Sequence, residues 1–400
     1  MIPVRMVEAA STAEAWEKAI QIVLSDGVTL ETQYDVDPNT GHRWEPSKDL
    51  TMTMVVQDAL AEPRLHVRMG GSAVEFGDYR AEVVEGIKDT WVRKDPSELA
   101  WPYTYHDRFT NWGGRLNFAA PGLFEAEKPL SGLTPDPANP WVGIGLVRWM
   151  KDQQEESVPV VQELDPFDQV QYIVKTLADA PFSRRAIAMT GFPIGDSQTS
   201  DPPCLRYIWC RGIYEGHLKI DLHSHWRSRD AWGAAGFNMF ALTEWQGEIA
   251  AAVQERIIER IEGKDSVDCP ICGQAIRSSE MARGEGNDRT EMGFFCLHCK
   301  AYPFLVSAGG YVDISDSFHI YGKDRDDVEK RFLPSLDLPF EKRFWNLNQS
   351  PHREMLEEGR EKALNLVARR DEGVPHHNEI LKGGIYLGID AEKDWEIGVD

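Results

Sequence analysis

The sequence predicts an α+β fold, because strand-like and helix-like patterns both recur along its 400 residues. Apolar and polar side chains alternate from residue 205 to 222 around a Glu-Gly turn at 215–216, which indicates a β-hairpin. Residues 239–262 then carry apolar side chains on one helical face, and Gly263 would end this helix. Hydrophobic residues make up 42% of the chain, enough for a sizeable core in one large domain or two smaller ones.

The first hundred residues predict two helices and two strands. Ser11 and Glu14 form a capping-box pattern that would begin a helix, and Gly27 is placed to end it. Residues 28–57 predict a strand, a polar turn and a second strand. Residues 79–109 predict a further helix followed by an aromatic loop.

The middle and the end of the chain add a loop, a strand and two helices. Residues 119–141 contain five prolines, which predicts a surface loop rather than a domain boundary. A helix is expected from Asp165 to Ala178, followed by a strand over residues 183–192. Another helix is expected near residues 351–370.

The charge and composition exclude several classes of protein. A net charge of −22 argues against a general affinity for nucleic acid phosphates, so an anionic ligand would need a local basic cluster. The chain has no run of about eighteen apolar residues, as a membrane span requires, and its first residues lack the apolar core of a secretion signal. Six cysteines in 400 residues do not form a secreted disulfide scaffold, so we expect a cytoplasmic protein with reduced thiols.

Four of the cysteines predict a structural zinc site. Cys269 and Cys272 form one Cys-x2-Cys pair, Cys296 and Cys299 form another, and 23 residues separate the pairs. Two such pairs can supply the four thiolates of a tetrahedral zinc ribbon, which leaves no open position for catalysis. A redox dithiol is the less favoured alternative, and His298 is expected to be exposed rather than bound.

The stretch from residue 201 to 238 concentrates the polar chemistry of the chain. It brings a thiol, a cation, a hydroxyl, a carboxylate and an amide into a short run, from Cys204, Arg227, Ser228, Asp230 and Asn238. A cysteine in such a set is a candidate nucleophile, and an arginine can hold a phosphate or carboxylate. The amide offers a donor beside an acceptor, which suits an O=C–N–H ring edge.

These motifs resemble the core of the thymidylate synthase family, which includes the pyrimidine nucleotide hydroxymethylases. Pro-Pro-Cys204 is followed by Arg227-Ser-x-Asp and, eleven residues after the arginine, by the last residue of Gly-Phe-Asn238. Ser-Arg184-Arg185 and His319-Ile-Tyr321 stand upstream and downstream in the family's order. The resemblance implies a single domain over residues 1–400 with a mixed sheet flanked by helices, homodimeric through the sheet. The zinc ribbon that the cysteines predict at 265–302 interrupts the family's pattern and is therefore expected to be an insertion.

The resemblance also implies a reaction. The Cys204 thiolate would add to C6 of a pyrimidine nucleotide, and C5 would then attack the one-carbon unit of 5,10-methylene-tetrahydrofolate. The resemblance implies that Arg227 and Ser228 bind the phosphate, together with Arg184 and Arg185 from across a dimer interface. Asp230 would contact the pterin, and His319 and Tyr321 would bind the sugar hydroxyl. Asn238 would recognise the base edge.

Two further roles have alternative candidates in this sequence. The family uses a glutamate that organises water and proton transfer near the ring, and an active-site tyrosine. The candidates are Glu82 or Glu85 for the glutamate, Tyr105 or Tyr103 for the tyrosine, and Arg43 for an arginine that an early loop lends to the phosphate site.

The motifs are compatible with two products, a methyl or a hydroxymethyl group at C5. Methylation of dUMP to dTMP is favoured, and hydroxymethylation of dUMP, dCMP or CMP, with water in place of hydride, is the alternative. Leu205 stands where many members of the family have a histidine, the spacing from Cys204 to Arg227 is long, and the acidic tail is atypical. A non-catalytic zinc-ribbon protein that binds nucleic acid or a partner is a distant alternative, against which the charge of −22 counts.

Overall fold

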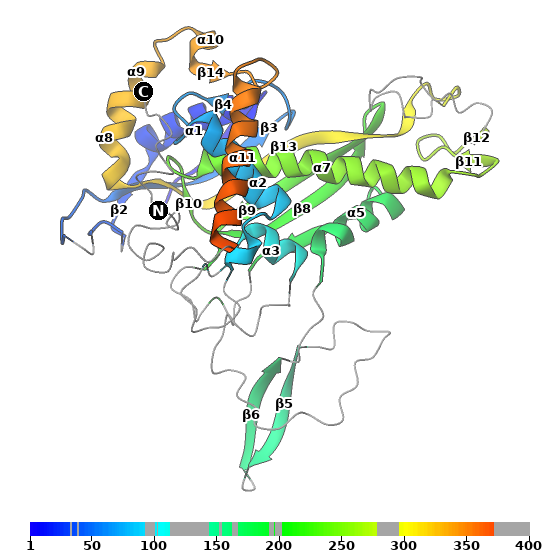
Figure 1. Cartoon of the computed structure of the whole chain (residues 1–400), viewed down its shortest axis with the longest axis horizontal. Coiled ribbons are helices and arrows are strands. Elements are labelled where there is room, and N and C mark those ends of the chain that lie inside the picture. The colour runs from blue at the N-terminus through cyan, green and yellow to red at the C-terminus, as the bar shows by residue number, and fades with distance from the viewer. Residues whose placement is uncertain are drawn as a thin grey trace.

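The computed structural model describes residues 1–32, 34–37, 40–92, 101, 103–112, 144–151, 154–161, 167–191, 196, 202–277 and 296–371. Its centre is an eight-stranded mixed sheet with long helices packed against it (Figure 1). The strands of this sheet are β1 (Val4–Ala9), β2 (Val28–Leu30), β3 (Ser47–Val56), β7 (Ile187–Met189), β8 (Leu205–Tyr214), β9 (His217–Trp226), β10 (Arg229–Asp230) and β13 (Tyr302–Ile320).

The sheet mixes parallel and antiparallel pairs. Its main path runs β1-β3-β13-β9-β8-β7, with β2 added to β3 and β10 added to β13. The β1–β3, β9–β13 and β10–β13 pairs are parallel, and the other pairs are antiparallel. The long strand β13 thus joins the N-terminal strands to the central hairpin.

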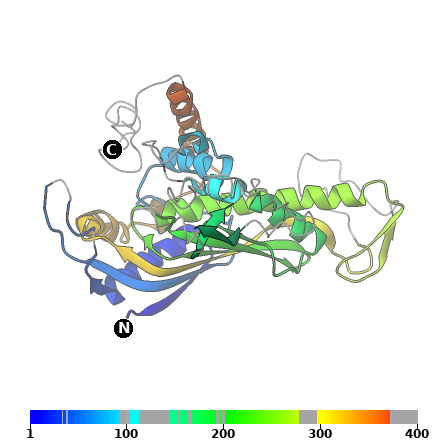
Figure 2. The same ribbon diagram turned by 90° about the horizontal axis from the view of Figure 1, so that it is seen from below.

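The helices that contact the sheet lie on one of its faces. Helix α7 (Ala235–Ile261) packs on β9 and β13, and α1 (Thr12–Asp26), α2 (Ala73–Glu85) and α5 (Gln169–Asp179) all contact α7. Figure 2 shows α7 running along one side of the sheet. Alternate residues of β9 are buried beneath these helices, and the residues between them point to the other face and are only half-buried.

The core joins distant parts of the chain through Trp16 of α1. Its indole is fully buried and donates a hydrogen bond from Nε1 to the carbonyl oxygen of Ala231 at 2.9 Å. Its ring packs against Trp232, at a centroid distance of 5.7 Å. The start of the chain is therefore fixed to the segment that follows the central hairpin.

The remaining elements are shorter or lie beside the sheet. Strand pairs form between β4 (Leu65–His66) and β14 (Phe344–Trp345), β5 (Ile144–Lys151) and β6 (Gln154–Val161), and β11 (Ser266–Asp268) and β12 (Ala275–Arg277). The other helices are α3 (Tyr105–Thr110), α8 (Arg325–Asp327), α9 (Leu333–Ser335), α10 (Phe340–Arg343) and α11 (His352–Asp371), with short turns of other pitch at Asp89–Trp91, Gly322–Asp324 and Val328–Phe332. None of the described helices is long and apolar enough to span a membrane.

The α+β class and the mixed sheet flanked by helices are confirmed. Ser11 caps α1 by accepting the N–H of Glu14, and the hairpin turns at residues 215–216 as predicted. The helix expected over residues 165–178 is observed as α5, which begins after its N-cap Asp168, and Asp168 accepts the N–H of Gln171 at 2.9 Å. Asp165, the proline-rich segment 119–141 and the acidic tail lie outside the described residues.

Candidate active site

Cys204 lies directly before β8, where its side chain is half-buried at the edge of the core. Its carbonyl oxygen accepts the N–H of Arg227 at 3.0 Å. The next residue, Leu205, is fully buried and pairs in register with Trp226, the last residue of β9. The hairpin therefore returns the Arg-Ser-x-Asp motif to the cysteine, although 22 residues separate them in the sequence.

Arg227 is held against the two prolines that precede Cys204. Its Nη2 donates to the carbonyl oxygen of Pro202 at 2.7 Å, and its Nε donates to that of Pro203 at 3.2 Å. A guanidinium has five N–H donors in a rigid plane, so this arrangement fixes the cation and leaves donors for an anionic ligand.

Tyr105 and Tyr321 both lie within electrostatic range of Cys204. Burial raises the pKa of Tyr105, and the negative charge that Cys204 can carry raises it further. Burial also raises the pKa of Tyr321, followed by the charges of Asp230, Tyr34 and Cys204. Both phenols therefore keep their protons at neutral pH and remain hydrogen-bond donors.

A buried ion pair lies at the start of β10, directly after Ser228. Arg229 is almost fully buried, pairs with Asp313 of β13 and places its guanidinium carbon 4.0 Å from the ring centroid of Trp226. Asp313 also accepts hydrogen bonds from Tyr311 at 2.7 Å and from Ser224 at 3.1 Å. The pair stabilises the junction between β10 and β13, next to the segment that carries Ser228 and Asp230.

Asp230 and His319 face each other across that junction. They are register partners in the parallel β10–β13 pair. Asp230 Oδ1 accepts the N–H groups of Trp232 at 3.0 Å and Gly233 at 2.9 Å. A Cβ at position 233 would lie 2.7 Å from Asp230 Oδ2, so glycine permits this close approach. His319 is only 4% exposed.

Asn238 lies in the first turn of α7 and contacts Tyr79 of α2. Its Nδ2 donates to the Tyr79 hydroxyl oxygen at 2.5 Å, and the side chain is 7% exposed. The Tyr79 ring packs against Phe237 at a centroid distance of 5.7 Å. Helix α2 therefore reaches the candidate base-reading residue through a tyrosine.

Glu82 sits in a different environment one turn further along α2. It is 7% exposed, and Lys88 Nζ lies 3.2 Å from its Oε2 and 2.5 Å from Asp78 Oδ1. Burial raises the pKa of Glu82, while the charge of Lys88 opposes the rise. The alternative, Glu85, pairs with Arg80 and Arg360. The structure joins Tyr79 to Asn238, and a catalytic role for Glu82 stays a prediction.

Arg184 and Arg185 lie apart from these residues, at the exposed entry to β7. Within the described part of the chain, neither forms an ion pair. Arg184 borders a cavity of about 260 Å³ on the open face of the sheet, with Tyr207 and Trp209 among its lining residues. Arg43 is also exposed and lies 3.8 Å from Glu31.

Comparison with known proteins identifies the family. No family model matches the chain. A Methanosarcina barkeri protein named "Putative thymidylate synthase" is 36% identical over 240 residues, which cover 60% of this chain and 77% of that protein. The chain belongs to the thymidylate synthase family. A Methanosarcina mazei protein of the same name is 20% identical over 251 residues, covering 62% of this chain and 82% of that protein. The thermostable thymidylate synthase A of Bacillus subtilis shares 15% identity with a TM-score of 0.39, covering 80% of this chain and 83% of that one, which is too distant to support an inference.

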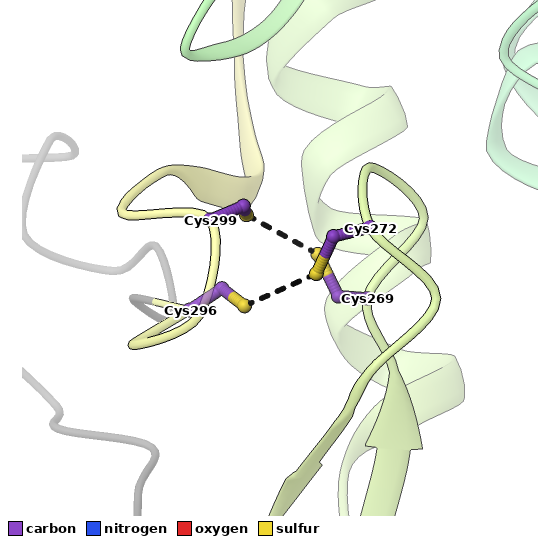
Figure 3. Close-up of side chains that lie close together, drawn as sticks. All are labelled: Cys269, Cys272, Cys296 and Cys299. Carbon is purple, nitrogen blue, oxygen red and sulfur yellow. Dashed lines mark hydrogen bonds between the residues drawn. The ribbon is translucent and has the colours of Figure 1, made fainter.

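The four cysteines of the two Cys-x2-Cys pairs lie close together in the structure. The sulfurs of Cys269, Cys272, Cys296 and Cys299 all lie within 4.8 Å of one another (Figure 3). The sulfurs of Cys269 and Cys299 are 3.7 Å apart, as are those of Cys272 and Cys296. Four Zn–S bonds of about 2.3 Å in a tetrahedron place sulfurs roughly 3.8 Å apart, so the cluster fits zinc. His298 is exposed.

The two Cys-x2-Cys turns have the same backbone pattern. Gly273 N–H donates to the Cys269 carbonyl, and Lys300 N–H donates to the Cys296 carbonyl, both at 2.8 Å. Gly273 has φ 72° and Lys300 has φ 54°, so the residue after each second cysteine is left-handed. A repeated turn of this kind presents both thiols of each pair to one point, which suits a shared metal ion.

Sequence reasoning misses Tyr79 at the candidate site and a separate buried cluster around Arg108. Tyr79 stands in no motif, and its role depends on the position of Asn238 on α7. The buried Arg108 donates to the Thr190 carbonyl at 3.3 Å and lies 3.4 Å from Asp196, which Arg206 also approaches at 3.4 Å. No local motif marks these residues, because strands and helices distant in sequence bring them together.

Proposed function

We propose that this chain transfers a one-carbon unit to C5 of a pyrimidine nucleotide, converting dUMP to dTMP with 5,10-methylene-tetrahydrofolate as the donor. The observation that carries the proposal is the surroundings of Cys204, in a chain that belongs to the thymidylate synthase family. The thiol is half-buried within electrostatic range of two phenols that keep their protons, and Arg227 is fixed against the prolines that precede Cys204. The hairpin therefore brings a nucleophile and a cation that can bind an anion together at its open end.

In the proposed reaction the Cys204 thiolate forms a bond to C6 of the pyrimidine ring. The ring electrons move toward O4, and C5 becomes the nucleophile that attacks the one-carbon unit. Loss of the C5 proton then expels tetrahydrofolate, which returns a hydride to the exocyclic methylene and leaves as dihydrofolate. The C6–S bond to Cys204 breaks, and the product is dTMP. Tyr105 lies within electrostatic range of the thiol and keeps its proton, so it can donate a hydrogen bond to a bound ligand. Arg227 and Ser228 bind the phosphate, Asp230 contacts the pterin, and His319 and Tyr321 bind the sugar hydroxyl.

The base preference is assigned to Asn238. Uracil offers an acceptor at O4 and a donor at N3, which one amide can answer with its own donor and acceptor. The contact with Tyr79 supports this role, because it restrains the amide and the phenol can pass a hydrogen bond on to a neighbouring group.

The phosphate site is proposed to be completed across a homodimer. Arg184 and Arg185 are exposed on the side of the sheet away from the helices and form no ion pair within the described chain. Exposed cations beside an open aromatic surface fit a role in the site of a neighbouring subunit.

The metal is proposed to be zinc, held by the four-cysteine cluster of the segment 265–302. The segment lies between α7 and β13 in the chain, and we propose that it is an insertion within a single domain over residues 1–400. Four thiolates close the coordination shell, so the ion would stabilise the fold and take no part in the reaction.

Mass spectrometry of the product tests the proposal. Protein incubated with dUMP and methylene-tetrahydrofolate should yield dTMP, and Cys204→Ala should yield none. Hydroxymethyl-dUMP, which carries one more oxygen atom, would instead assign the chain to the hydroxymethylases. Turnover that survives Cys204→Ala, or no turnover of any pyrimidine nucleotide, would contradict the proposed chemistry.

A further inference from the structure

Three polar side chains of β3 and β13 form a hydrogen-bonded chain that ends at His319. Asp49 of β3 and His319 of β13 are register partners. Ser317 stands between them: its Oγ lies 2.7 Å from Asp49 Oδ2 and 3.1 Å from His319 Nδ1. The β3–β13 register shifts between Ser315 and Phe318, and this irregularity accompanies the bridging position of Ser317.

The single proton of Ser317 decides the direction of this chain. A carboxylate only accepts hydrogen bonds, so the Ser317 hydroxyl must donate to Asp49. Its oxygen is then free to accept, and His319 must supply the N–H from Nδ1. A neutral imidazole has one N–H, so the lone pair of His319 is left on Nε2. Burial lowers the pKa of His319, which favours the neutral ring that this arrangement needs.

His319 Nε2 is buried and lacks a partner among the described residues. The side chain is only 4% exposed, lies opposite Asp230 in register, and its ring packs 4.5 Å from that of Tyr321. Neither a carboxylate nor the face of a phenol ring donates a hydrogen bond to a lone pair. A buried acceptor without a donor is unfavourable, so Nε2 is set to accept a hydrogen bond from a ligand group or from a water molecule that the ligand displaces.

We propose that Asp49 and Ser317 are positioning residues that hold His319 in its Nδ1–H tautomer, so that Nε2 accepts a hydrogen bond from the sugar hydroxyl of the substrate. The site therefore selects a ligand that donates at this position, and a group of similar size that only accepts is rejected. The identity of the ligand rests on the proposed function, whereas the tautomer is a property of the free protein.

The tautomer is tested by nitrogen-15 NMR of the histidine side chains in the free protein. The wild-type protein should show His319 protonated on Nδ1. Asp49→Asn reverses the chain, because the new amide donates to Ser317, which then donates to Nδ1, and the proton moves to Nε2. Asp316→Asn is the matched control, since this exposed carboxylate lies 3.3 Å from His225 instead. Protonation of His319 on Nε2 in the wild-type protein would overturn the proposal.

Ligand selection is tested by calorimetry with dUMP and its 3′-fluoro analogue. dUMP carries one free sugar hydroxyl, at C3′, and fluorine can accept but not donate. We expect the analogue to bind the wild-type protein about ten- to a hundredfold more weakly than dUMP. This difference in affinity between the two ligands should decrease in Asp49→Asn but not in Asp316→Asn. Equal binding of both ligands to the wild-type protein would overturn the proposal. Failure of every pyrimidine nucleotide to bind would overturn the proposed function instead, and the NMR result would still decide the tautomer.

Discussion

Asn238 is the residue at which the choice of base is made in the proposed site. Cytosine presents a donor at N4 and a bare acceptor at N3, so an amide set for uracil leaves one contact unsatisfied. An unpaired buried polar group costs about 1–3 kcal/mol, equivalent to roughly ten- to a hundredfold in selectivity. The side chain is 7% exposed, so water cannot readily replace the lost contact.

We therefore predict that the wild-type protein prefers dUMP to dCMP and that Asn238→Asp shifts the preference toward dCMP. A carboxyl group, protonated or bridged by water, suits the cytosine edge better than an amide does. Comparison of kcat/KM for both nucleotides with both proteins measures the shift. A wild-type enzyme that prefers dCMP would exclude the assignment of Asn238 as the reader of uracil.

The residues with chemical signatures are those that the sequence could predict. Cys204, Arg227 and Asn238 stand in motifs with a fixed spacing, so they could be proposed before their positions were known. Tyr79 and Asp49 carry no such signature, because their roles depend on which distant side chain each one meets. A tyrosine on α2 and an aspartate on β3 are common surface or core residues until α7 and β13 are placed beside them.

At the scale of single elements, α2 is fixed at its C-terminal end by a buried lysine. Lys88 is 1% exposed, lies within ion-pair distance of Asp78 and Glu82, and stands over the rings of Trp91 and Trp101 at 5.5 and 5.8 Å. Burial opposes the charge of Lys88, but the two carboxylates hold its pKa above the ordinary value. The lysine thus neutralises two acidic groups that α2 carries into the interior.

Replacement of this lysine should destabilise the fold. Lys88→Met leaves two buried carboxylates without a cation, and loss of one partner of a buried ion pair costs about 3–5 kcal/mol. Urea unfolding should show the loss, and Asp78→Asn with Glu82→Gln should restore part of it. Lys330→Met, at an exposed pair with Asp326, is the control and should leave the midpoint unchanged. A Lys88→Met midpoint equal to that of the control would show that the pair does not stabilise α2.

The two Cys-x2-Cys turns form a second local element, and we expect its stability to require a bound metal ion. We predict one zinc ion per chain, and its removal by a chelator should lower the melting temperature. Cys272→Ser should lose the metal, whereas Cys204→Ala should keep it while losing activity, because Cys204 lies outside the cluster. Elemental analysis measures both variants. Purified protein without zinc or iron, or full zinc in Cys272→Ser, would contradict the prediction.

Local sequence patterns predict individual helices and strands, but they do not predict which strands pair with one another. The Ser11 cap, the alternation around residues 215–216 and the long apolar face of α7 were all predicted from neighbouring residues. Strand β13 was not predicted, although it runs from the cysteine cluster to His319 and separates β3 from β9. Its position depends on pairing with strands far away in the sequence, which no local periodicity encodes.

The whole molecule has a covered and an open sheet face, and the open face is apolar at several points. Exposed or half-buried aromatic, aliphatic and imidazole side chains lie along it, at Met6, Ile187, Met189, Tyr207, Trp209, His223 and His225. Clustered apolar groups on a sheet face favour association with another surface. A second copy of the chain, related by a two-fold axis, would cover this face and bring each Arg184-Arg185 pair to its neighbour.

If the sites are shared in this way, two inactive variants should restore each other. Arg185→Ala lacks a phosphate ligand for the neighbouring site, and Cys204→Ala lacks its own nucleophile. A hybrid dimer has one site with an intact thiol and an intact arginine. Random pairing makes half of the dimers hybrid, so about a quarter of all sites should be intact after equal mixing and subunit exchange.

The recovered activity is measured after the two variants are mixed under conditions that allow exchange, with light scattering to establish the dimer. The control is Cys204→Ala mixed with the double variant Cys204→Ala/Arg185→Ala, which contains no nucleophile and should remain inactive. A monomer in solution would rule out the shared site directly. A dimer that exchanges subunits without recovering activity would show that Arg185 does not serve its neighbour, because every hybrid would still contain one complete set of the residues proposed here.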